Sequence, residues 1–298
     1  MVMVTLSFIA AAFGAAVFAG FLGALFGIGG GIIIVPFLTA FMGIPIHEGI
    51  AISIVSVIAT SNAGGSAYVD QRITNIQLGM YLEIATTSGA LVGAFVALLL
   101  KSWELYLIFV ALLLYMAFTS IRTSKTDEAR IRRGDFAKAK QGRVAKYLNL
   151  SGSYYDHSEK MEVEYVVTKA RAGALVSSLA GIISGLLGVG GGIIKVAAMN
   201  LFMNVPIKAA VATSKFMIGV TAVTSALLFF LAGFVNPYLI APVALGTTAG
   251  ATIGTWVMPR TKSSVLKVAF AILVISLAYV MLAQGLALGF NIHLPSTG

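Results

Sequence analysis

Two lysines, Lys195 and Lys215, lie inside long apolar segments of the chain. Lys195 directly follows the glycine cluster Gly188–Gly192, and Lys215 follows Thr213 and Ser214. A lysine deep in a bilayer costs roughly 2.5–3.5 kcal/mol on insertion scales, so it normally has a function or a partner. Next to a helix start, where unpaired N–H groups and the helix dipole also attract negative charge, such a cation predicts an anion site. Alternatively, either lysine extends to the membrane surface, or Lys195 pairs with an acid.

One acid, Glu83, lies six residues inside another apolar segment. A carboxyl group at this place can carry a proton, so Glu83 is a candidate for coupling transport to proton symport or antiport. Its alternative role is to pair with one of the two lysines. Several serine, threonine and asparagine residues also lie in the apolar segments. Because serine and threonine often pack helices together in membranes, only some of these residues are expected to contact a ligand. The hydroxyl and amide groups that could donate to the oxygens of an anion belong to Ser53, Thr60, Ser61, Asn62, Asn200, Thr213 and Ser214.

The glycine cluster beside Lys195 occurs twice, as Gly27–Gly31 and Gly188–Gly192, at an offset of 161 residues. Each glycine in a helix interior costs roughly 1 kcal/mol relative to alanine, so both clusters should break a helix within apolar sequence. The spacing also suits close helix packing. A dinucleotide loop is excluded, because the third glycine of that motif and a soluble βαβ context are missing. Paired helix breaks often form transporter sites, and the glycines assigned to the site are Gly29, Gly30, Gly31, Gly190, Gly191 and Gly192.

The duplication extends well beyond the glycines. Between Gly20–Ser53 and Gly181–Ser214, 15 of the 34 aligned pairs are identical without a gap. Agreement at one offset over this length indicates two structural repeats. The two lysines have aliphatic counterparts in the first half, Ile34 and Ile54, so the duplicated site is electrically asymmetric.

The composition excludes several functional classes. The chain is 58% hydrophobic and only 10% charged, whereas soluble domains carry about 25% charged residues, so we expect an integral membrane protein. With no cysteine and three histidines far apart, no metal site and no cofactor are expected. The sequence has no histidine pair, no Gly-x-Ser-x-Gly motif and no carboxylate cluster, which argues against an enzyme. The net charge of +9 does not indicate nucleic-acid binding, because 12 of the 20 Lys and Arg residues fall within 122–171.

Ten apolar segments follow one another along the chain. Most have the roughly 20 residues needed to cross about 30 Å of hydrocarbon, but 31–43 and 192–204 would reach only about 20 Å as helices. These two are either half-helices or arms of re-entrant hairpins, with protein surrounding the irregular backbone at the glycine tip. The first segment lacks a charged n-region and a clear cleavage site, so we expect a retained helix. The segments cover 4–26, 31–43, 48–69, 77–100, 104–121, 172–187, 192–204, 208–232, 238–258 and 265–289.

Five segments precede the charged loop and five follow it, so the two halves should enter the membrane from opposite sides. We therefore predict an all-α polytopic membrane protein with two inverted repeats, each with a glycine-broken short or re-entrant helix. The first repeat covers 1–121, a basic linker covers 122–170 and the second repeat covers 171–298. The positive-inside rule places the linker in the cytoplasm.

The linker itself changes character along its length. We expect a helix over 128–148, a turn over 151–156 and a strand over 161–168. It is either a solvated connection or an element that docks a partner or regulates the protein.

Several of these motifs together resemble the TauE/SafE sulfite exporter family. The resemblance covers nearly the whole chain and implies a transporter of small sulfur-containing anions, sulfite or C2 organosulfonates such as sulfoacetate, in the bacterial cytoplasmic (inner) membrane. One departure is Ala197, where the family pattern has proline, while the first half has Pro36 at the equivalent position. The motifs are the paired glycine clusters, Pro206-Ile207-Lys208, Ala212-Thr213-Ser214, the linker stretch Gly152–Asp156, and Thr-Thr-x-Gly-Ala at 86–90 and 247–251.

We therefore expect a secondary transporter that binds an anion near the bilayer midplane, between the glycine breaks, and moves it by alternating access. The resemblance implies the direction of export. The expected partners are the small anion, the lipid bilayer and protons as a coupling ion, with no nucleic acid; no oligomeric state is predicted. The alternatives are a passive anion channel and a transporter of a small carboxylate.

Overall fold

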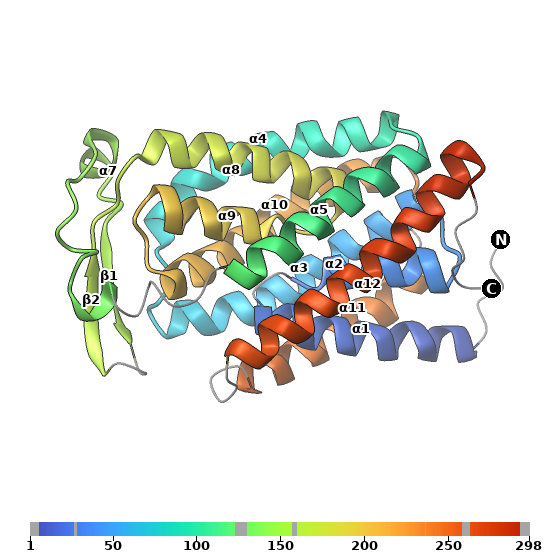
Figure 1. The fold of residues 1–298 in the computed structure, drawn as a ribbon, viewed down its shortest axis with the longest axis horizontal. Helices are drawn as coiled ribbons and strands as arrows, with labels where there is room; N and C mark the ends of the chain where they lie inside the picture. The colour runs from blue at the N-terminus through green and yellow to red at the C-terminus, as the bar shows by residue number, and fades with distance from the viewer. Residues whose placement is uncertain are drawn as a thin grey trace.

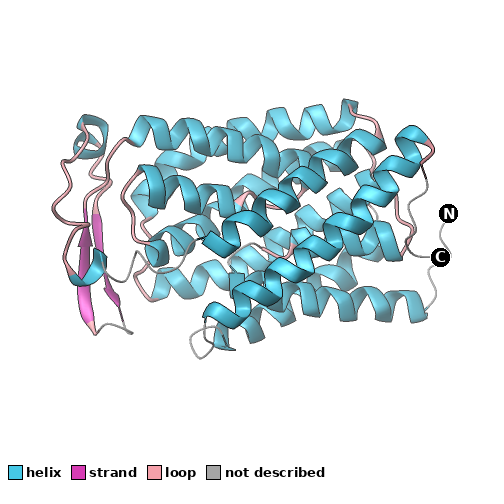
Figure 2. Ribbon diagram, in the orientation of Figure 1, coloured by secondary structure: helices cyan, strands magenta, loops and turns pink. Residues whose placement is uncertain are grey.

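The helices run along one long axis and form an elongated bundle, with a small module at one end (Figure 1). The computed structural model describes residues 6–26, 29–122, 130–156, 160–235, 237–257 and 263–292. Figure 2 shows that the strands lie in the end module. The helices in this part of the chain are α1 (Leu6–Phe26), α2 (Gly31–Pro36), α3 (Ile46–Asp70), α4 (Ile76–Leu99), α5 (Ser102–Arg122), α7 (Arg143–Tyr147), α8 (Ala170–Leu187), α9 (Gly192–Ala197), α10 (Ile207–Leu231), α11 (Pro237–Val257) and α12 (Ser263–Phe290).

Many of these helices suit a membrane. Among the described residues, five helical stretches are long and apolar enough to cross one: α3, α4, α8, α10 and the 271–290 part of α12. Large apolar side chains such as Leu175 and Leu231 lie exposed on the outside of the bundle. Because exposed leucine in such numbers is costly in water, the outer surface is suited to lipid.

The helix bounds repeat at the offset found in the sequence. Adding 161 to the bounds of α2 gives those of α9, and the same step takes α3 to α10. Each short helix continues into a π-helical turn, at Phe37–Phe41 and Ala198–Phe202, which are also 161 residues apart. The packing repeats as well: α1 of the first half packs on α11 of the second, and α8 of the second half packs on α4 of the first. The two halves therefore share these helices and the pairing of α1 with α11 and of α8 with α4.

The short helices are arms of re-entrant hairpins. Thr168, just before α8, donates from its backbone N–H to Met203 O at 3.0 Å and from its hydroxyl to Phe202 O at 3.1 Å. The start of α8 and the end of the α9 arm thus lie at the same end of the bundle. In the first half, Gly30 lies against Ala19, so the chain also turns back along α1. Of the two arrangements that the sequence allowed, the structure has the hairpin.

Glycine is required at both tips. Gly30 and Gly191 precede the short helices with φ of 78° and 63°, in the left-handed region that side chains rarely adopt. Glycine also brings the long helices together, as the spacing predicted. A Cβ on Gly89 of α4 would lie 2.1 Å from Ser178 O of α8, and one on Gly250 of α11 would lie 1.9 Å from Val17 O of α1. The backbones of each pair are therefore in direct contact.

The end module corrects the all-α assignment for the linker. Residues 152–156, which were expected to be a turn, form strand β1 (Gly152–Asp156), paired antiparallel with β2 (Met161–Tyr165). Alternate residues of both strands are buried, because the hairpin packs one face on the bundle. The continuous helix expected over 128–148 is interrupted. Residues 130–132 are helical, turns follow Arg132, with Gly134 at a φ of 65°, and α7 covers 143–147. Residues 123–129 and 157–159 of the predicted linker lie outside the described part.

The module is anchored to the bundle and is not simply a solvated connection. Its Phe136, Tyr154 and Val163 belong to a buried cluster with residues of α4 and α10. Asn75, the N-cap of α4, donates to Leu150 O at 2.8 Å and to the hydroxyl of Tyr165 at 2.9 Å. Burial raises the pKa of Tyr165 to about 12, so this hydroxyl stays protonated throughout the physiological range.

An ion pair adds to this anchoring. Lys208, in the first turn of α10, donates to Asp156 Oδ1 at 2.6 Å. The Asp156 side chain is almost fully buried, so removing Lys208 would leave a carboxylate without its charge partner in the interior.

Replacing Gly93 by alanine should destabilise the bundle. A Cβ there would lie 2.0 Å from Ile182 O, and overpacking of this kind costs about 1–3 kcal/mol. The matched control is Gly14→Ala on α1, where a Cβ meets nothing within 4 Å. Thermal unfolding in detergent should show a lower melting temperature for Gly93→Ala and no loss for Gly14→Ala. Equal melting temperatures would contradict the close α4–α8 contact.

Candidate functional site

The two hairpin tips meet inside the bundle. A Cβ on Gly31 would lie 2.6 Å from Gly188 O of the other tip. Gly29 and Gly190 both lie against Val57 and Ile218, which are themselves a repeat pair of α3 and α10. The glycine breaks therefore face each other, as predicted, but in this conformation they are packed together and not separated by a binding space.

Lys195 lies in a buried chain of polar groups. Its side chain, 0% exposed, donates from Nζ to the hydroxyl of Thr221 at 2.8 Å. The Thr221 hydroxyl donates to Glu83 Oε1 at 2.7 Å, and Thr87 donates to the same oxygen at 3.0 Å. The other oxygen, Oε2, is buried and has no hydrogen-bond partner among the described residues. Of the roles considered for Lys195, the structure shows a link to Glu83 through a hydroxyl bridge.

Lys215 lies beside the first hairpin tip, which contains Gly29. It is 3% exposed, and its ammonium lies beside Gly64 and 5.5 Å from the ring centroid of Tyr68, in cation–π range. Together with Gly29, Thr60 and Ser61 it lines a small cavity of about 10 Å³, the space of a single water molecule. Among the described residues, Nζ donates no hydrogen bond and forms no ion pair with an acid.

The repeat shows how the two charged places differ. Lys195, Lys215 and Glu83 have Ile34, Ile54 and Ala244 as counterparts 161 residues away. Thr221, which sequence reasoning missed, is the counterpart of Thr60, which it selected. Applying the offset to Thr60 would have found the bridging hydroxyl.

Most of the other predicted donors bind the protein backbone. The Ser53 hydroxyl donates to Gly188 O at 2.8 Å, and that of Ser214 donates to Gly192 O at 3.2 Å. Thr213 accepts a hydrogen bond from the Asn75 N–H at 3.0 Å, near the end module, and Asn200 donates to Val205 O at 3.0 Å. These side chains hold the tips and loops in place and do not converge on one cavity.

The predicted residues thus fall into separate groups. Gly29, Thr60 and Lys215 share the small cavity, while Lys195 and Glu83 form the buried chain. Asn62 is exposed and lines a groove between α3 and α10. Among the residues that the structure describes, no group of three or more acidic and histidine side chains could hold a metal ion. The tips themselves are built by Gly30, Gly31, Gly190, Gly191 and Gly192.

Comparison with known proteins decides the family. The family model described as "Sulfite exporter TauE/SafE" matches residues 12–281. The chain belongs to the TauE/SafE family. It is also 26% identical over 275 residues to the "Probable membrane transporter protein YunE" of Bacillus subtilis (strain 168), covering 90% of this chain and 95% of that protein. No solved structure matches the chain.

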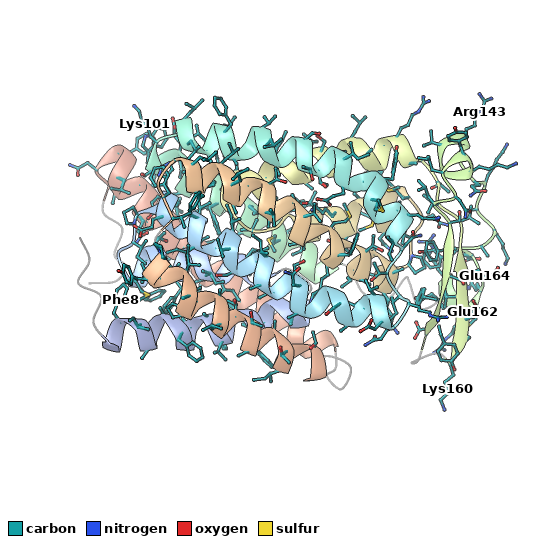
Figure 3. The ribbon with its side chains drawn as sticks, turned by 180° about the vertical axis from the view of Figure 1, so that it is seen from behind. Phe8, Lys101, Arg143, Lys160, Glu162 and Glu164 are labelled. Atoms are coloured by element: carbon teal, nitrogen blue, oxygen red, sulfur yellow. The ribbon has the colours of Figure 1, made fainter. Side chains whose placement is uncertain are left out.

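Family membership confirms the resemblance seen in the sequence. The protein is a membrane transporter of the TauE/SafE family, and the buried cations lie within a transporter fold. Its two ends are distinct: Arg143, Glu162 and Glu164 of the end module lie at one end, and Lys101 and Phe8 lie at the other (Figure 3).

The variant Thr221→Val tests the buried chain. It removes the hydroxyl between Lys195 and Glu83 while conserving shape, and it should lower the free energy of unfolding by about 2–3 kcal/mol, because a bond to each charge is lost. The counterpart Thr60→Val loses only bonds to the carbonyls of Gly29 and Val57 and should cost about 1 kcal/mol. Thermal melting in detergent compares the two. If Thr60→Val proved the more damaging, the bridging role of Thr221 would be wrong.

Proposed function

We propose that the protein is a secondary transporter that exports small sulfur-containing anions, such as sulfite or sulfoacetate, across the cytoplasmic membrane. One observation carries the proposal. The ammonium of Lys215 is buried beside the first hairpin tip, faces a cavity and has no acidic partner among the described residues. A small anion would neutralise it.

The energetics favour Lys215 over Lys195 as the primary anion contact. An uncompensated charge in an apolar interior is costly, and an opposite charge relieves that cost. Lys195 already has Glu83 beyond Thr221, whereas Lys215 has only the ring of Tyr68. We retain Lys195 in the site as a second cation, which an anion would reach if the tips separated.

The hydroxyls at the cavity supply further donors. Thr60 now donates to Gly29 O at 3.1 Å, and Ser61 donates to Lys215 O. Both lie at the wall of the cavity, so a small rotation would turn them toward the oxygens of a bound anion. The assignment of the remaining predicted donors, Ser53, Asn62, Asn200, Thr213 and Ser214, to the site stays a prediction.

The cavity must widen before it can hold an anion. Its volume of about 10 Å³ accepts a single water molecule. We propose alternating access between two inverted repeats, in which one repeat moves against the other and opens the cavity to one side at a time. The repeat partners α3 and α10 support inversion, because Gly65 lies against Phe216 and Ser61 lies against Gly219, which is an antiparallel pairing.

The orientation follows from charge. We propose repeats at 1–121 and 171–298, with the basic 122–170 region in the cytoplasm under the positive-inside rule. The separation of the end module from Lys101 along the bundle (Figure 3) supports this arrangement.

Glu83 is the proposed proton carrier. One of its oxygens accepts hydrogen bonds from two hydroxyls, while the other is buried and has no hydrogen-bond partner in the described part of the chain. A carboxyl group with one open oxygen can take up a proton there, and Thr221 would transmit the change in charge to Lys195. Transport of the anion and movement of a proton would be coupled in this way.

Binding can be tested with the purified protein in detergent. Sulfite or sulfoacetate should raise the melting temperature of the wild type, since a ligand at 100 times its Kd stabilises the folded state by about 2.7 kcal/mol. Lys215→Met should abolish this shift, whereas Lys101→Met, at the exposed end of the bundle, should keep it. Sulfate, thiosulfate, taurine and small carboxylates complete the series. Stabilisation by carboxylates alone would replace the proposed substrate class with the alternative one.

Coupling can be tested in proteoliposomes. A gradient of one pH unit should drive up to about tenfold accumulation of the anion by the wild type, and Glu83→Gln should make flux independent of the gradient. Glu104→Gln, at the half-buried start of α5, is the control. Concentrative transport by Glu83→Gln would remove Glu83 from the mechanism. Flux that never saturates and ignores the gradient in the wild type would favour a passive channel.

A further inference from the structure

A groove of about 540 Å³ lies between α3 and α10, apart from the small cavity at Lys215. Its α3 wall includes Ser61, Asn62, Ser66 and Asp70, and its α10 wall includes Gly219 and Val223. Neither Lys195 nor Glu83 lines it. The groove therefore needs an explanation of its own.

The α3 wall carries a polar stripe. Asn62, Ser66 and Asp70 are spaced four residues apart on one face of the helix, and all three are exposed. An amide, a hydroxyl and a carboxylate in line on a lipid-facing surface would be costly, because hydrocarbon offers them no hydrogen bonds. Such a stripe is stable where water fills the space beside it.

The repeat provides an internal control for this reasoning. The counterparts of Asn62, Ser66 and Asp70 on α10 are Val223, Leu227 and Leu231. Leu227 and Leu231 are exposed as well, at 59% and 72%, and they are apolar, as lipid contact requires. Neither of them lines the groove, whereas Val223 does. In the pairs Ser66/Leu227 and Asp70/Leu231, the residue that lines the groove is polar and the one that does not is apolar, so the difference follows the surroundings and not the helix position.

The groove connects the end module to the cavity. Ser61 lines both spaces. At the other end, Asp70 closes α3 five residues before Asn75, whose side chain bonds Leu150 and Tyr165 of the module. Arg72 is exposed and lies two residues after Asp70. The end of the groove nearest the end module therefore has a positive and a negative charge close together in sequence.

We infer that the groove is a water-filled passage from the end module to the Lys215 cavity, and that the transported anion uses it. The identity of the cargo rests on the function proposed above, whereas the presence of water does not. Asn62 lies eight residues before the end of α3. At 1.5 Å per residue, water in the groove would reach about 12 Å along the helix from that end.

The chain offers a clean test, because it contains no cysteine. Single cysteines are placed at Asn62→Cys and Ser66→Cys. The controls are Leu227→Cys and Leu231→Cys, at exposed positions of α10 that do not line the groove. Tyr147→Cys, on the surface of the end module, is the positive control. Each variant is reconstituted in vesicles, its melting temperature is checked, and the rate of reaction with a charged, membrane-impermeant methanethiosulfonate is measured by mass spectrometry.

The passage predicts rates for Asn62→Cys and Ser66→Cys at least about tenfold above those of Leu227→Cys and Leu231→Cys, from the side at which Tyr147→Cys reacts. Equal, slow rates at all four positions, with Tyr147→Cys reacting, would overturn it.

A second arm tests the cargo separately. Sulfoacetate should slow the labelling of Asn62→Cys, and Lys215→Met should remove this protection. Labelling that no sulfur anion slows would support the water passage and count against the proposed substrate.

Discussion

The two re-entrant tips must satisfy their backbone hydrogen bonds inside the bundle, and much of the structure follows from this requirement. Irregular backbone at membrane depth is tolerated only where protein or a wet cavity surrounds it. The tips lie against each other, and hydroxyls from the long helices meet their carbonyls: Ser53 at Gly188, Thr60 at Gly29 and Ser214 at Gly192. The helices α3 and α10, which carry these hydroxyls, are consequently packed together at the centre.

The buried charges, Lys195, Glu83 and Lys215, lie next to the hydroxyls of this duplicated framework. The duplicated framework provides a threonine at the same place in each half, Thr60 and Thr221. Only one of them received a lysine and a glutamate as neighbours, and there the hydroxyl bridges the two. The other threonine kept its backbone bonds and borders a cavity that Lys215 enters from α10. One framework thus supports a compensated charge pair and an uncompensated cation.

Much of the fold could be predicted from the sequence, because it depends on local physics and repetition. Clustered glycines such as Gly30 and Gly191 disfavour a continuous helix through their local sequence alone, and the offset of 161 relates the helices of one half to those of the other. The hairpin of the linker was missed because its turn-like residues, Gly152 and Ser153, pair with a second strand, and its inward side chains are buried only by contact with the bundle.

The candidate site was less predictable, for a physical reason. A serine or threonine in apolar sequence can donate to a ligand or to a carbonyl, and the sequence does not show which carbonyl lies nearby. Ser53, Ser214 and Thr213 were selected as donors to an anion, yet each is bonded to the backbone. Likewise, the apolar run around each lysine is similar, and only the fold shows that Glu83 compensates Lys195 and not Lys215.

The most direct test is an anomalous difference map from crystals of the protein grown with sulfoacetate. The account predicts a sulfur peak beside Lys215, with sulfonate oxygens within hydrogen-bond distance of Nζ and near the hydroxyls of Thr60 and Ser61. A peak at Lys195 instead, with Lys215 still without an anion, would contradict the assignment of Lys215 as the primary anion contact.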